Sequence, residues 1–550
     1  MKPRMLTHRV AILAATWLLI LEGPGLAAQA PETPLFAPHE VALRAVDHYA
    51  NPYRELEADI ALTPPDGGAE RTAPLFWDGG DSWKFRFAPD RIGEWRWTVR
   101  SRDPGLNGQR GGFQAVASNH PGSIRPMRGF PRHFQRQDGS RFWFLGDTAW
   151  ALCTDNAQEK HDRDAVERYL EARAAQGFNV VHSMLLSEAG WDNRGGPAFA
   201  NLAEERINPG YWREVDHRLA YANRLTLVCG LALAWGDKGD EPYAWRKFPS
   251  VQARQRYARY LAARYAAYDV YFILAGEWHA EIATRGSTAE AVRKEFLDLG
   301  AVLQANDPHR RMMAIHPMND NGSVREFNEA SWMTFGDYQQ NYHDLHGRVI
   351  ESLGFGKPVV NAEYGYYLRD QDGDGIPDKE NSTTIEIMRH ATWDIAIAGG
   401  YVVTGFGTTY FGGNRDPGPF NVEAGKNRPW EAQLGHLKTL FAGLGWWKLE
   451  PHDELLSCIT PRGRDRSHLN RVAPPETTYR CLADPGRTYV LYVRGLSEPV
   501  KLALASPGEG FRTRQWNPRT GEFTSIQCEP DNGGFSYRPP DGQDWVVVVD

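Results

Sequence analysis

The chain has 550 residues, a length that fits two to four domains rather than one. Its formal net charge is -7 at pH 7, and its lysine and arginine residues are scattered rather than clustered. Scattered positive charge argues against a surface that follows the phosphates of a nucleic acid. Aromatic residues make up 12% of the chain, which suits stacking on sugar rings and equally suits the cores of β-rich domains.

The first 30 residues have the pattern of a secretion signal. A positively charged stretch at residues 1–9 precedes an apolar run from Val10 to Ile20, and Ala28-Gln29-Ala30 fits the small-x-small cleavage rule. The apolar run is short for a membrane span, and no later run approaches the required length. We therefore expect an exported protein, periplasmic or extracellular, that is cleaved near Ala30. A retained N-terminal anchor is the alternative.

Residues 31–118 contain short strands separated by turn residues. Apolar and polar residues alternate at 57–62, 82–87 and 93–100, and Asp78-Gly79-Gly80-Asp81 predicts a tight turn. Alternation of this kind is typical of half-exposed antiparallel strands, so the segment predicts a small β-sandwich.

Residues 119–450 change to a repeated pattern of strand, loop and helix. The expected strands are 142–146, 179–183, 225–233, 270–275, 312–316, 331–335, 358–362 and 401–405. The expected helices are 164–176, 211–223, 251–267 and 288–305. Eight strands that alternate with helices predict a (β/α)8 TIM barrel, in which the fifth and sixth strands have the weakest pattern.

Residues 451–550 lose helical periodicity and contain strand patterns at 487–493 and 544–549. The chain is therefore expected to be a multidomain α/β protein, with the barrel flanked by two small β-sandwiches. Cys458, Cys481 and Cys528 fall in this last segment, so one disulfide could form there, although the sequence does not choose the pair. No CxxC or HxxxH spacing occurs, which argues against a zinc site.

Two of the expected barrel strands end in a glutamate flanked by aromatic residues. The first run ends in Glu277 and the second in Glu363. The C-terminal ends of barrel strands are where catalytic residues lie, and glycoside hydrolysis requires two carboxyl groups. We expect Glu277 to act as general acid/base, with Trp278 and Leu274 as apolar neighbours, and Glu363 as nucleophile. A loop salt bridge is the ordinary alternative for either residue alone.

Further polar and aromatic residues near the expected strand ends are candidates for contact with a sugar. They are Asp147, Trp150, His182, Trp235, Trp278, His316, Tyr338 and Tyr364, of which either Tyr364 or Tyr338 could donate a hydrogen bond to Glu363. Each has an ordinary alternative. Asp147 could cap a turn, the histidines could pack inside the barrel, and the tryptophans could belong to the core. Glu188 is the reserve carboxylate should Glu277 lack the role.

Two motifs identify a resemblance that covers nearly all of the chain. Residues 142–150, Phe-Trp-Phe-Leu-Gly-Asp-Thr-Ala-Trp, and residues 169–181, Tyr-Leu-Glu-Ala-Arg-Ala-Ala-Gln-Gly-Phe-Asn-Val-Val, resemble the opening of the barrel of apiosidase-like glycoside hydrolases (glycoside hydrolase family 140 and relatives). The preceding segment resembles the β-sandwich often placed before that barrel. The last segment, around Trp516-Asn-Pro-Arg-Thr-Gly-Glu-Phe, resembles a β-sandwich of the collagen-binding type. The resemblance implies catalytic carboxylates at the ends of the fourth and seventh strands, which here are Glu277 and Glu363.

One acidic loop has the spacing of a calcium site. The expected ligands are Asp370, Asp372, Asp374, Ile376 and Asp378, and Gly375 stands where a calcium loop turns sharply. Asn381 stands where the usual bidentate glutamate would be, so a solvated turn is the alternative. We expect a structural calcium ion and no catalytic cofactor.

The sequence therefore favours an exported, retaining glycoside hydrolase that acts on plant or microbial polysaccharide, as a monomer or small homo-oligomer. The alternative is a carbohydrate-binding or matrix-adhesion protein whose barrel has lost activity. An esterase or a protease ranks last because neither GxSxG nor HExxH occurs.

Overall fold

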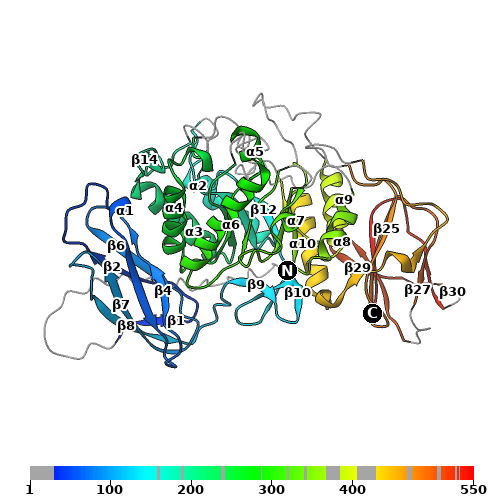
Figure 1. Cartoon of the computed structure of the whole chain (residues 1–550). Helices are drawn as coiled ribbons and strands as arrows, with labels where there is room; N and C mark the ends of the chain where they lie inside the picture. Colours follow the sequence, from blue (N-terminus) through cyan, green and yellow to red (C-terminus); the bar gives the residue numbers. More distant parts are fainter. Residues whose placement is uncertain are drawn as a thin grey trace, which may run out of the picture.

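The computed structural model places three units in a row along the chain (Figure 1). It describes residues 30–157, 161–186, 191–236, 242–285, 288–318, 321–339, 344–366, 384–405, 429–466, 473–504, 510–526, 529–531 and 533–550. An N-terminal β-sandwich precedes a barrel, and a second β-sandwich follows it. The expected fold class is confirmed. The expected secretion signal lies outside the described residues.

The N-terminal sandwich has its own hydrophobic core. One sheet has the strand order β1-β8-β7-β3-β4 and the other the order β2-β6-β5. The strands are β1 (Glu32–Pro34), β2 (His39–Arg44), β3 (Ala58–Thr63), β4 (Arg71–Pro74), β5 (Phe76–Trp77), β6 (Ser82–Phe87), β7 (Gly93–Ser101) and β8 (Arg110–Val116), with helix α1 (Pro52–Glu55) between β2 and β3. Phe85, Trp95 and Phe113 are fully buried, as expected for alternate residues of strands that face a partner sheet.

Eight parallel strands form a nearly closed barrel. They are β12 (Leu145–Thr148), β13 (Val180–Met184), β16 (Val228–Ala232), β17 (Val270–Ile273), β18 (Met313–Ala314), β20 (Gly336–Gln339), β21 (Val359–Glu363) and β22 (Tyr401–Thr404). The first and eighth strands, β12 and β22, pair with each other. Between β18 and β20 the sheet pairing is interrupted, and Thr334 bridges the gap by hydrogen bonds of 2.9 Å to the backbone of Met313. The short strand β19 (Asn321–Gly322) pairs antiparallel with β20.

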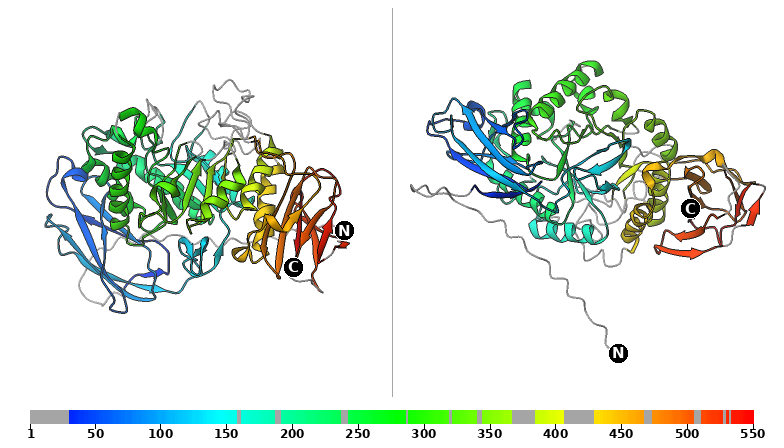
Figure 2. Two further views of the ribbon diagram at one scale, coloured as in Figure 1. Left: turned by 45° about the vertical axis from the view of Figure 1, so that its right-hand side comes forward. Right: turned by 90° about the horizontal axis from the view of Figure 1, so that it is seen from below.

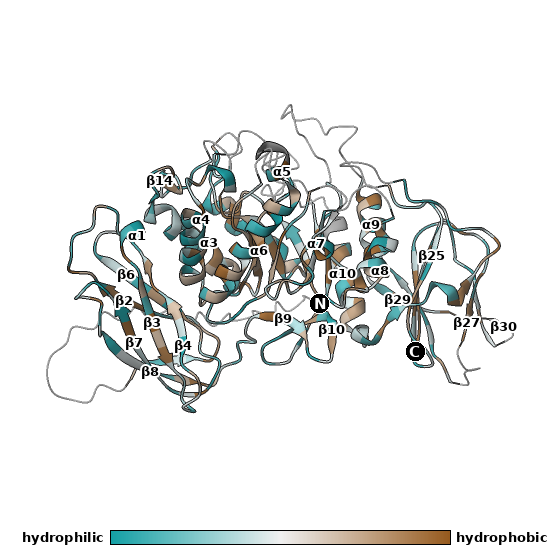
Figure 3. Ribbon diagram, viewed as in Figure 1, coloured by the Kyte–Doolittle hydropathy of each residue, from teal (hydrophilic) through white to brown (hydrophobic). Residues whose placement is uncertain are grey.

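Helices surround these strands, and the view from below shows them as an outer ring (Figure 2). They are α2 (Arg163–Ala175), α3 (Pro209–Arg224), α4 (Val251–Arg264), α5 (Ala280–Arg285), α6 (Ala289–Asn306), α7 (Ser323–Phe327), α8 (Leu345–Leu353), α9 (Ile385–Ala396) and α10 (Pro429–Ala442). Most of the long helices begin at a side chain that accepts a hydrogen bond from the first turn: Asp162, Asn208, Ser250, Thr288, Asp344 and Thr384. Hydrophobic residues gather along the central strands and on the helix sides that face them (Figure 3).

The sixth strand lies after the segment predicted for it. Residues 331–335 are apolar, but they form a turn and a buried connection that ends at the start of β20. The strand itself is Gly-Asp-Tyr-Gln, whose polar residues carry no strand pattern. The first strand is displaced similarly, because Phe142 to Phe144 precede β12 as core residues. The helices α8, α9 and α10 were not predicted from the sequence.

A three-stranded hairpin sheet covers the N-terminal end of the barrel. Its strands are β9 (Ile124–Met127), β10 (Phe130–Arg136) and β11 (Arg141–Phe142). The ring of Phe134 lies 5.3 Å from that of Phe144 and 5.1 Å from that of Tyr401. Phe134 therefore fills the bottom of the barrel, which leaves the opposite end for a site.

The C-terminal sandwich has a six-stranded sheet of order β23-β25-β26-β32-β28-β29 and a four-stranded sheet of order β24-β27-β31-β30. The strands are β23 (Glu450–Pro451), β24 (Leu456–Ser457), β25 (Thr478–Asp484), β26 (Thr488–Arg494), β27 (Val500–Ala503), β28 (Thr513–Asn517), β29 (Glu522–Ser525), β30 (Glu529–Asp531), β31 (Gly534–Tyr537) and β32 (Trp545–Val549). Cys458 and Cys481 carry free thiols, and Cys528 lies outside the described residues, so no disulfide joins the first two.

Both sandwiches contact the barrel helices through buried ion pairs and aromatic rings, including the pair of Arg389 on α9 with Asp544 on the C-terminal side. On the N-terminal side, Asp216 of α3 accepts hydrogen bonds from Arg86 and from Arg264, at 2.8 and 2.7 Å. On the C-terminal side, Trp393 of α9 stacks on Tyr492 of β26, with ring centroids 5.3 Å apart, and joins the sandwich to the barrel core. Within the described part of the chain, no helix is both long and apolar enough to cross a membrane.

Candidate active site

Glu277 lies on a tightly constrained turn just after β17. Its φ is 43°, a left-handed value that is uncommon for a residue with a side chain and is often found at functional sites. The preceding Gly276 pairs with Trp235 in a parallel bridge, and a Cβ added to this glycine would lie 1.9 Å from the Trp235 indole. Gly276 is therefore required by the close approach of the indole, and it sets the position of Glu277.

Two neutral donors hold the Glu277 carboxylate. The Trp235 indole Nε1–H donates to Oε2 at 3.0 Å, and the Gln339 amide Nε2–H donates to Oε1 at 2.9 Å. Trp235 follows β16 and Gln339 ends β20, so the donors come from strands on both sides of β17. The carboxylate is thereby oriented without a formal positive charge on either donor.

A charged group faces the second glutamate. Glu363 ends β21, and its Oε2 lies 3.3 Å from Nε2 of His316. The other ring nitrogen of His316, Nδ1, lies 3.0 Å from Oδ1 of Asp337 on β20. Burial disfavours the charged imidazole, but the facing carboxylates of Asp337 and Glu363 outweigh burial and raise the pKa of His316 to about 9. Burial also raises the pKa of Asp337, an effect that the charge of His316 opposes. The upward shift of the His316 pKa favours an imidazolium at neutral pH.

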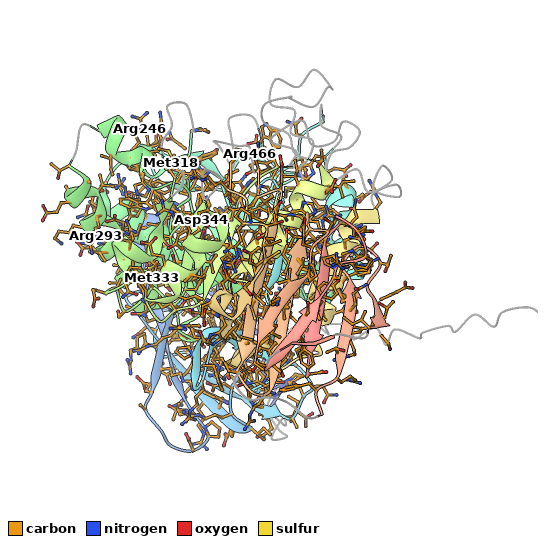
Figure 4. All side chains as sticks on the ribbon, turned by 90° about the vertical axis from the view of Figure 1, so that its right-hand side faces the viewer. Arg246, Arg293, Met318, Met333, Asp344 and Arg466 are labelled. Carbon is orange, nitrogen blue, oxygen red and sulfur yellow. The ribbon has the colours of Figure 1, made fainter. Side chains whose placement is uncertain are left out.

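Both glutamates belong to one site at the C-terminal ends of the strands. The Trp235 ring, which holds Glu277, lies 5.7 Å from the ring of His316, which holds Glu363. The Trp150 ring lies 5.1 Å from Trp235 and 6.0 Å from His316, and its Nε1–H donates to the Tyr366 hydroxyl at 3.2 Å. Met318 comes after the C-terminal end of β18, and Met333 comes before the N-terminal end of β20. Met318 lies above Met333 in Figure 4, so the C-terminal end of the barrel faces upward in that view.

His182 lies deeper in the same interior. Its ring is 5.0 Å from Trp150 and 6.3 Å from His316, and only 1% of the residue is exposed. Neither ring nitrogen has a hydrogen-bond partner among the described residues. Burial, with a smaller contribution from His316, lowers the pKa of His182 well below its ordinary value, so this imidazole is neutral. The sequence prediction thus brings Trp150, His182, Trp235 and His316 together with the two glutamates.

Asp147 is engaged in a structural ion pair instead. Its Oδ2 accepts hydrogen bonds from Arg173 Nε at 2.5 Å and from the Tyr169 hydroxyl at 2.9 Å. Its Oδ1 accepts one from Thr404 at 2.8 Å. The carboxylate is fully buried between the barrel and α2, where it neither faces a sugar, as predicted, nor caps a turn.

Three aromatic residues that were predicted to contact the sugar make their contacts elsewhere. Tyr338 lies between Asp337 and Gln339 on β20, and neighbouring residues of a strand face opposite sides. Trp278 packs against Phe296 and Phe327 rather than beside the Glu277 carboxylate. The Tyr338 hydroxyl contacts Ser352 on α8. The Tyr364 hydroxyl bonds Thr392 of α9 at 2.5 Å. These contacts correct the expected roles of Trp278, Tyr338 and Tyr364, the last two of which were the alternative donors to Glu363.

Sequence reasoning missed Asp337, Gln339 and Tyr366. The first two lie on β20, which was predicted too early in the chain. No periodic signal pointed to them, because this strand is short and mostly polar.

The expected calcium ligands, from Asp370 to Asp378, and the reserve carboxylate Glu188 lie outside the described residues. Among the residues that are described, no group of three or more histidine, cysteine, aspartate or glutamate side chains could hold a metal ion.

A family model described as "Apiosidase-like, catalytic domain" matches residues 131–448, more than half of the chain and the whole barrel. The chain belongs to the apiosidase-like family and is a glycoside hydrolase. The resemblance expected from residues 142–150 and 169–181 is confirmed. A second model, a domain of unknown function called DUF5060, matches residues 32–102 in the N-terminal sandwich.

Solved structures resemble the chain in fold. A candidate glycoside hydrolase from Bacteroides vulgatus ATCC 8482 is 17% identical with a TM-score of 0.71, and the match covers 94% of this chain and 99% of that one. A glycoside hydrolase family 5 protein from the same organism is 18% identical with a TM-score of 0.60, covering 78% of this chain and 93% of that one. No curated protein matches the chain.

Proposed function

We propose that this glycoside hydrolase is an exported, retaining enzyme that cleaves plant or microbial polysaccharide, with Glu363 as nucleophile and Glu277 as general acid/base. The observation that supports these roles is the contrast between the two carboxylates. His316, an imidazolium, faces Glu363, whereas the indole and amide donors of Glu277 are neutral. A nucleophile must stay ionised, whereas an acid/base must gain and lose a proton in each turnover.

In the first step, protonated Glu277 gives its proton to the oxygen of the leaving group while Glu363 attacks the anomeric carbon. The glycosidic C–O bond breaks and an ester between the sugar and Glu363 forms. In the second step, the Glu277 carboxylate takes a proton from water, which attacks the anomeric carbon and releases Glu363. The donors from Trp235 and Gln339 keep the Glu277 carboxylate in one orientation through both steps.

The stereochemistry of the product tests this mechanism directly. Retaining enzymes have carboxyl groups about 5–5.5 Å apart and inverting enzymes about 6.5–9.5 Å apart, because the latter must admit a water molecule. A proton NMR time course of hydrolysis should show the product anomer with the configuration of the substrate. Appearance of the opposite anomer first would mean that Glu363 activates water instead of attacking.

A panel of cell-wall polysaccharides tests the function as a whole. The panel should include apiose-containing pectin, since the matching family model is described as apiosidase-like. We expect sugar release by wild type and by the control Glu290→Gln, an exposed carboxylate at the start of α6, and none by Glu363→Gln. Equal release by wild type and Glu363→Gln would remove Glu363 from the proposed role. Binding without release by wild type would favour an inactive sugar-binding barrel.

We also propose that a calcium ion binds the loop from Asp370 to Asp378, whose spacing supplies hard oxygen ligands. Calcium that binds the folded protein and not the unfolded chain should stabilise the protein against heat. Calcium added to chelator-treated protein should raise its melting temperature, whereas magnesium should raise it less. An unchanged melting temperature would contradict the proposal.

A further inference from the structure

Asp337, His316 and Glu363 form a continuous line of hydrogen-bonding groups across three barrel strands. We propose that these residues act as a relay in which Asp337 holds His316 as an imidazolium, and His316 in turn orients Glu363 and keeps it ionised. This inference rests on the proposed role of Glu363. His316 and Asp337 are positioning residues here, since they act through the glutamate rather than on the sugar.

The relay is held in place by its backbone. The His316 N–H donates to the carbonyl of Ala275 at 2.9 Å, which joins the end of β18 to the end of β17. The Asp337 N–H donates to the Ser323 hydroxyl at 3.0 Å, and that hydroxyl approaches the Asp337 carbonyl oxygen at 3.1 Å. Ser323 therefore holds both backbone polar groups of Asp337, so the backbones of Asp337 and His316 are each fixed by hydrogen bonds.

The groups around His316 favour its charged form. The carboxylates of Asp337 and Glu363 face its two ring nitrogens, while the rings of Trp150, Trp235 and His182 enclose it. The charge of His316 also contributes to lowering the pKa of a second histidine, His279. Burial lowers the pKa of His279 to about 4 and that of His182 well below its ordinary value, so both stay neutral.

Deprotonation of His316 would break the relay whichever proton is lost. If Nε2 loses its proton, its lone pair faces the Oε2 atom of Glu363. If Nδ1 loses its proton, its lone pair faces Asp337. In either tautomer one buried carboxylate loses the hydrogen bond that His316 donates to it, which is costly in this interior. The relay therefore predicts an upper pH limit for glycosylation of Glu363, separate from any limit set by Glu277.

The proton on His316 can be observed without any substrate. Imidazole signals of protein labelled with ¹⁵N-histidine should be followed between pH 5 and 10, with His316→Gln used to assign the signal. We expect His316 to titrate near 9, and to titrate closer to the ordinary histidine value of about 6.5 in Asp337→Asn and in Glu363→Gln. The buried His133, whose Nδ1 lies 2.8 Å from the Tyr401 hydroxyl, is the matched control and should stay neutral throughout.

A test of how the relay affects catalysis needs a substrate that is cleaved without proton donation by Glu277. Once the panel has identified the sugar, its 2,4-dinitrophenyl glycoside supplies a leaving group that needs no proton. For this substrate, kcat/KM should fall above about pH 9 in wild type and at lower pH in Asp337→Asn. Asp337→Glu should restore part of the wild-type profile, because it returns the charge.

The outcomes separate this inference from the proposed function. A wild-type His316 signal that titrates at or below 6.5 would overturn the relay, whatever the enzyme hydrolyses. Identical pH profiles for wild type and Asp337→Asn would also overturn it, while leaving Glu363 as the nucleophile. If the His316 signal titrates near 9 but the protein releases no sugar, the proposed function is wrong. That result would still support the ion pairs of His316 with Asp337 and Glu363.

Discussion

Glu277 and Glu363 occupy equivalent places at the ends of barrel strands, yet their carboxylates are held by different kinds of donor. Neutral groups, the Trp235 indole and the Gln339 amide, hold Glu277. A charged group, the His316 imidazolium backed by Asp337, faces Glu363. The difference lies in the neighbouring strands rather than in the glutamates, so the role of a carboxylate in this barrel depends on the residues that other strands place beside it.

After the complete loss of sugar release expected in Glu363→Gln, the largest expected effect comes from replacing Glu277, the residue that the neutral donors Trp235 and Gln339 hold. Glu277→Gln should lower the rate on the natural glycan by about 10²–10⁴-fold, the usual contribution of general acid/base catalysis. On a 2,4-dinitrophenyl glycoside the first step should survive, because that leaving group needs no proton. Burst kinetics would show this as a rapid first turnover followed by slow release.

The same comparison with Glu363→Gln separates the two roles. That variant should show no burst with either substrate. A burst in Glu363→Gln and none in Glu277→Gln would mean that the assignments are reversed.

The next effect concerns His316 and the way in which the free energy of unfolding depends on pH. The pKa of His316 is raised above its unfolded value of about 6.5 to about 9, so its contribution is fully present below pH 6.5 and is lost as the pH rises through 9. That contribution is on the order of 3 kcal/mol, at about 1.36 kcal/mol for each pKa unit. Urea denaturation at several pH values should show wild type losing stability over this range.

In His316→Gln this loss of stability between pH 6.5 and 9 should disappear, although the variant is less stable overall. Trp235→Phe is the control from the neutral side and should keep the wild-type pH dependence, because the indole does not titrate. The same slope in wild type and in His316→Gln would show that His316 is not charged in the folded protein.

A smaller effect is expected from the turn that carries Glu277. Gly276→Ala places a methyl group 1.9 Å from the Trp235 indole, so the indole must move. We expect a loss of about 1–3 kcal/mol in the free energy of unfolding, as for other overpacked sites, together with a lower kcat. Gly445→Ala is the matched control, since its φ is -81° and no atom lies within 4 Å of the added methyl group. Wild-type stability in Gly276→Ala would show that the indole position is not constrained by this glycine.

The smallest effect should follow from the loss of one neutral donor. Trp235→Phe removes the hydrogen bond to Glu277 Oε2, and a neutral hydrogen bond contributes about 0.5–1.5 kcal/mol, which corresponds to a loss of roughly 2-fold to 13-fold in kcat. Trp77→Phe also removes one indole hydrogen bond, to Gly80 in the N-terminal sandwich, and should leave kcat unchanged. Equal kcat for both variants and wild type would show that the indole does not position Glu277.

The fold was largely predictable because apolar runs and amphipathic stretches of many residues indicate its strands and helices. Apolar runs at the fourth and seventh strands, and amphipathic stretches between strands, indicated the barrel and placed Glu277 and Glu363 at its rim. The sixth strand was misplaced because its apolar lead segment, residues 331–335, looks more like a strand than Gly336–Gln339 does. Residues that serve the site are polar, and polarity removes the periodic signal by which a strand is found.

The nearest sequence neighbours of the glutamates misled for a related reason. Trp278 and Tyr364 directly follow Glu277 and Glu363, but Trp278 lies in the turn after β17 and Tyr364 lies just beyond the end of β21, so neither needs to point in the direction of its neighbour. They pack outward, against α6 and α7 in one case and α9 in the other. Asp147 was also misassigned, because nothing local shows that Arg173, 26 residues further on, pairs with it.

The sequence by itself determined most of the barrel strands, and that two carboxylates lie at the same end of the barrel, because both follow from periodicity and from the position of a residue along its own strand. Only the tertiary structure decided which carboxylate faces the charged imidazole ring of His316. Gln339 lies 62 residues from Glu277 and His316 lies 47 from Glu363, so each pair meets only when the sheet curves into a barrel. Hydrogen bonds and pKa shifts depend on distances between such residues, and no local pattern in the chain encodes those distances.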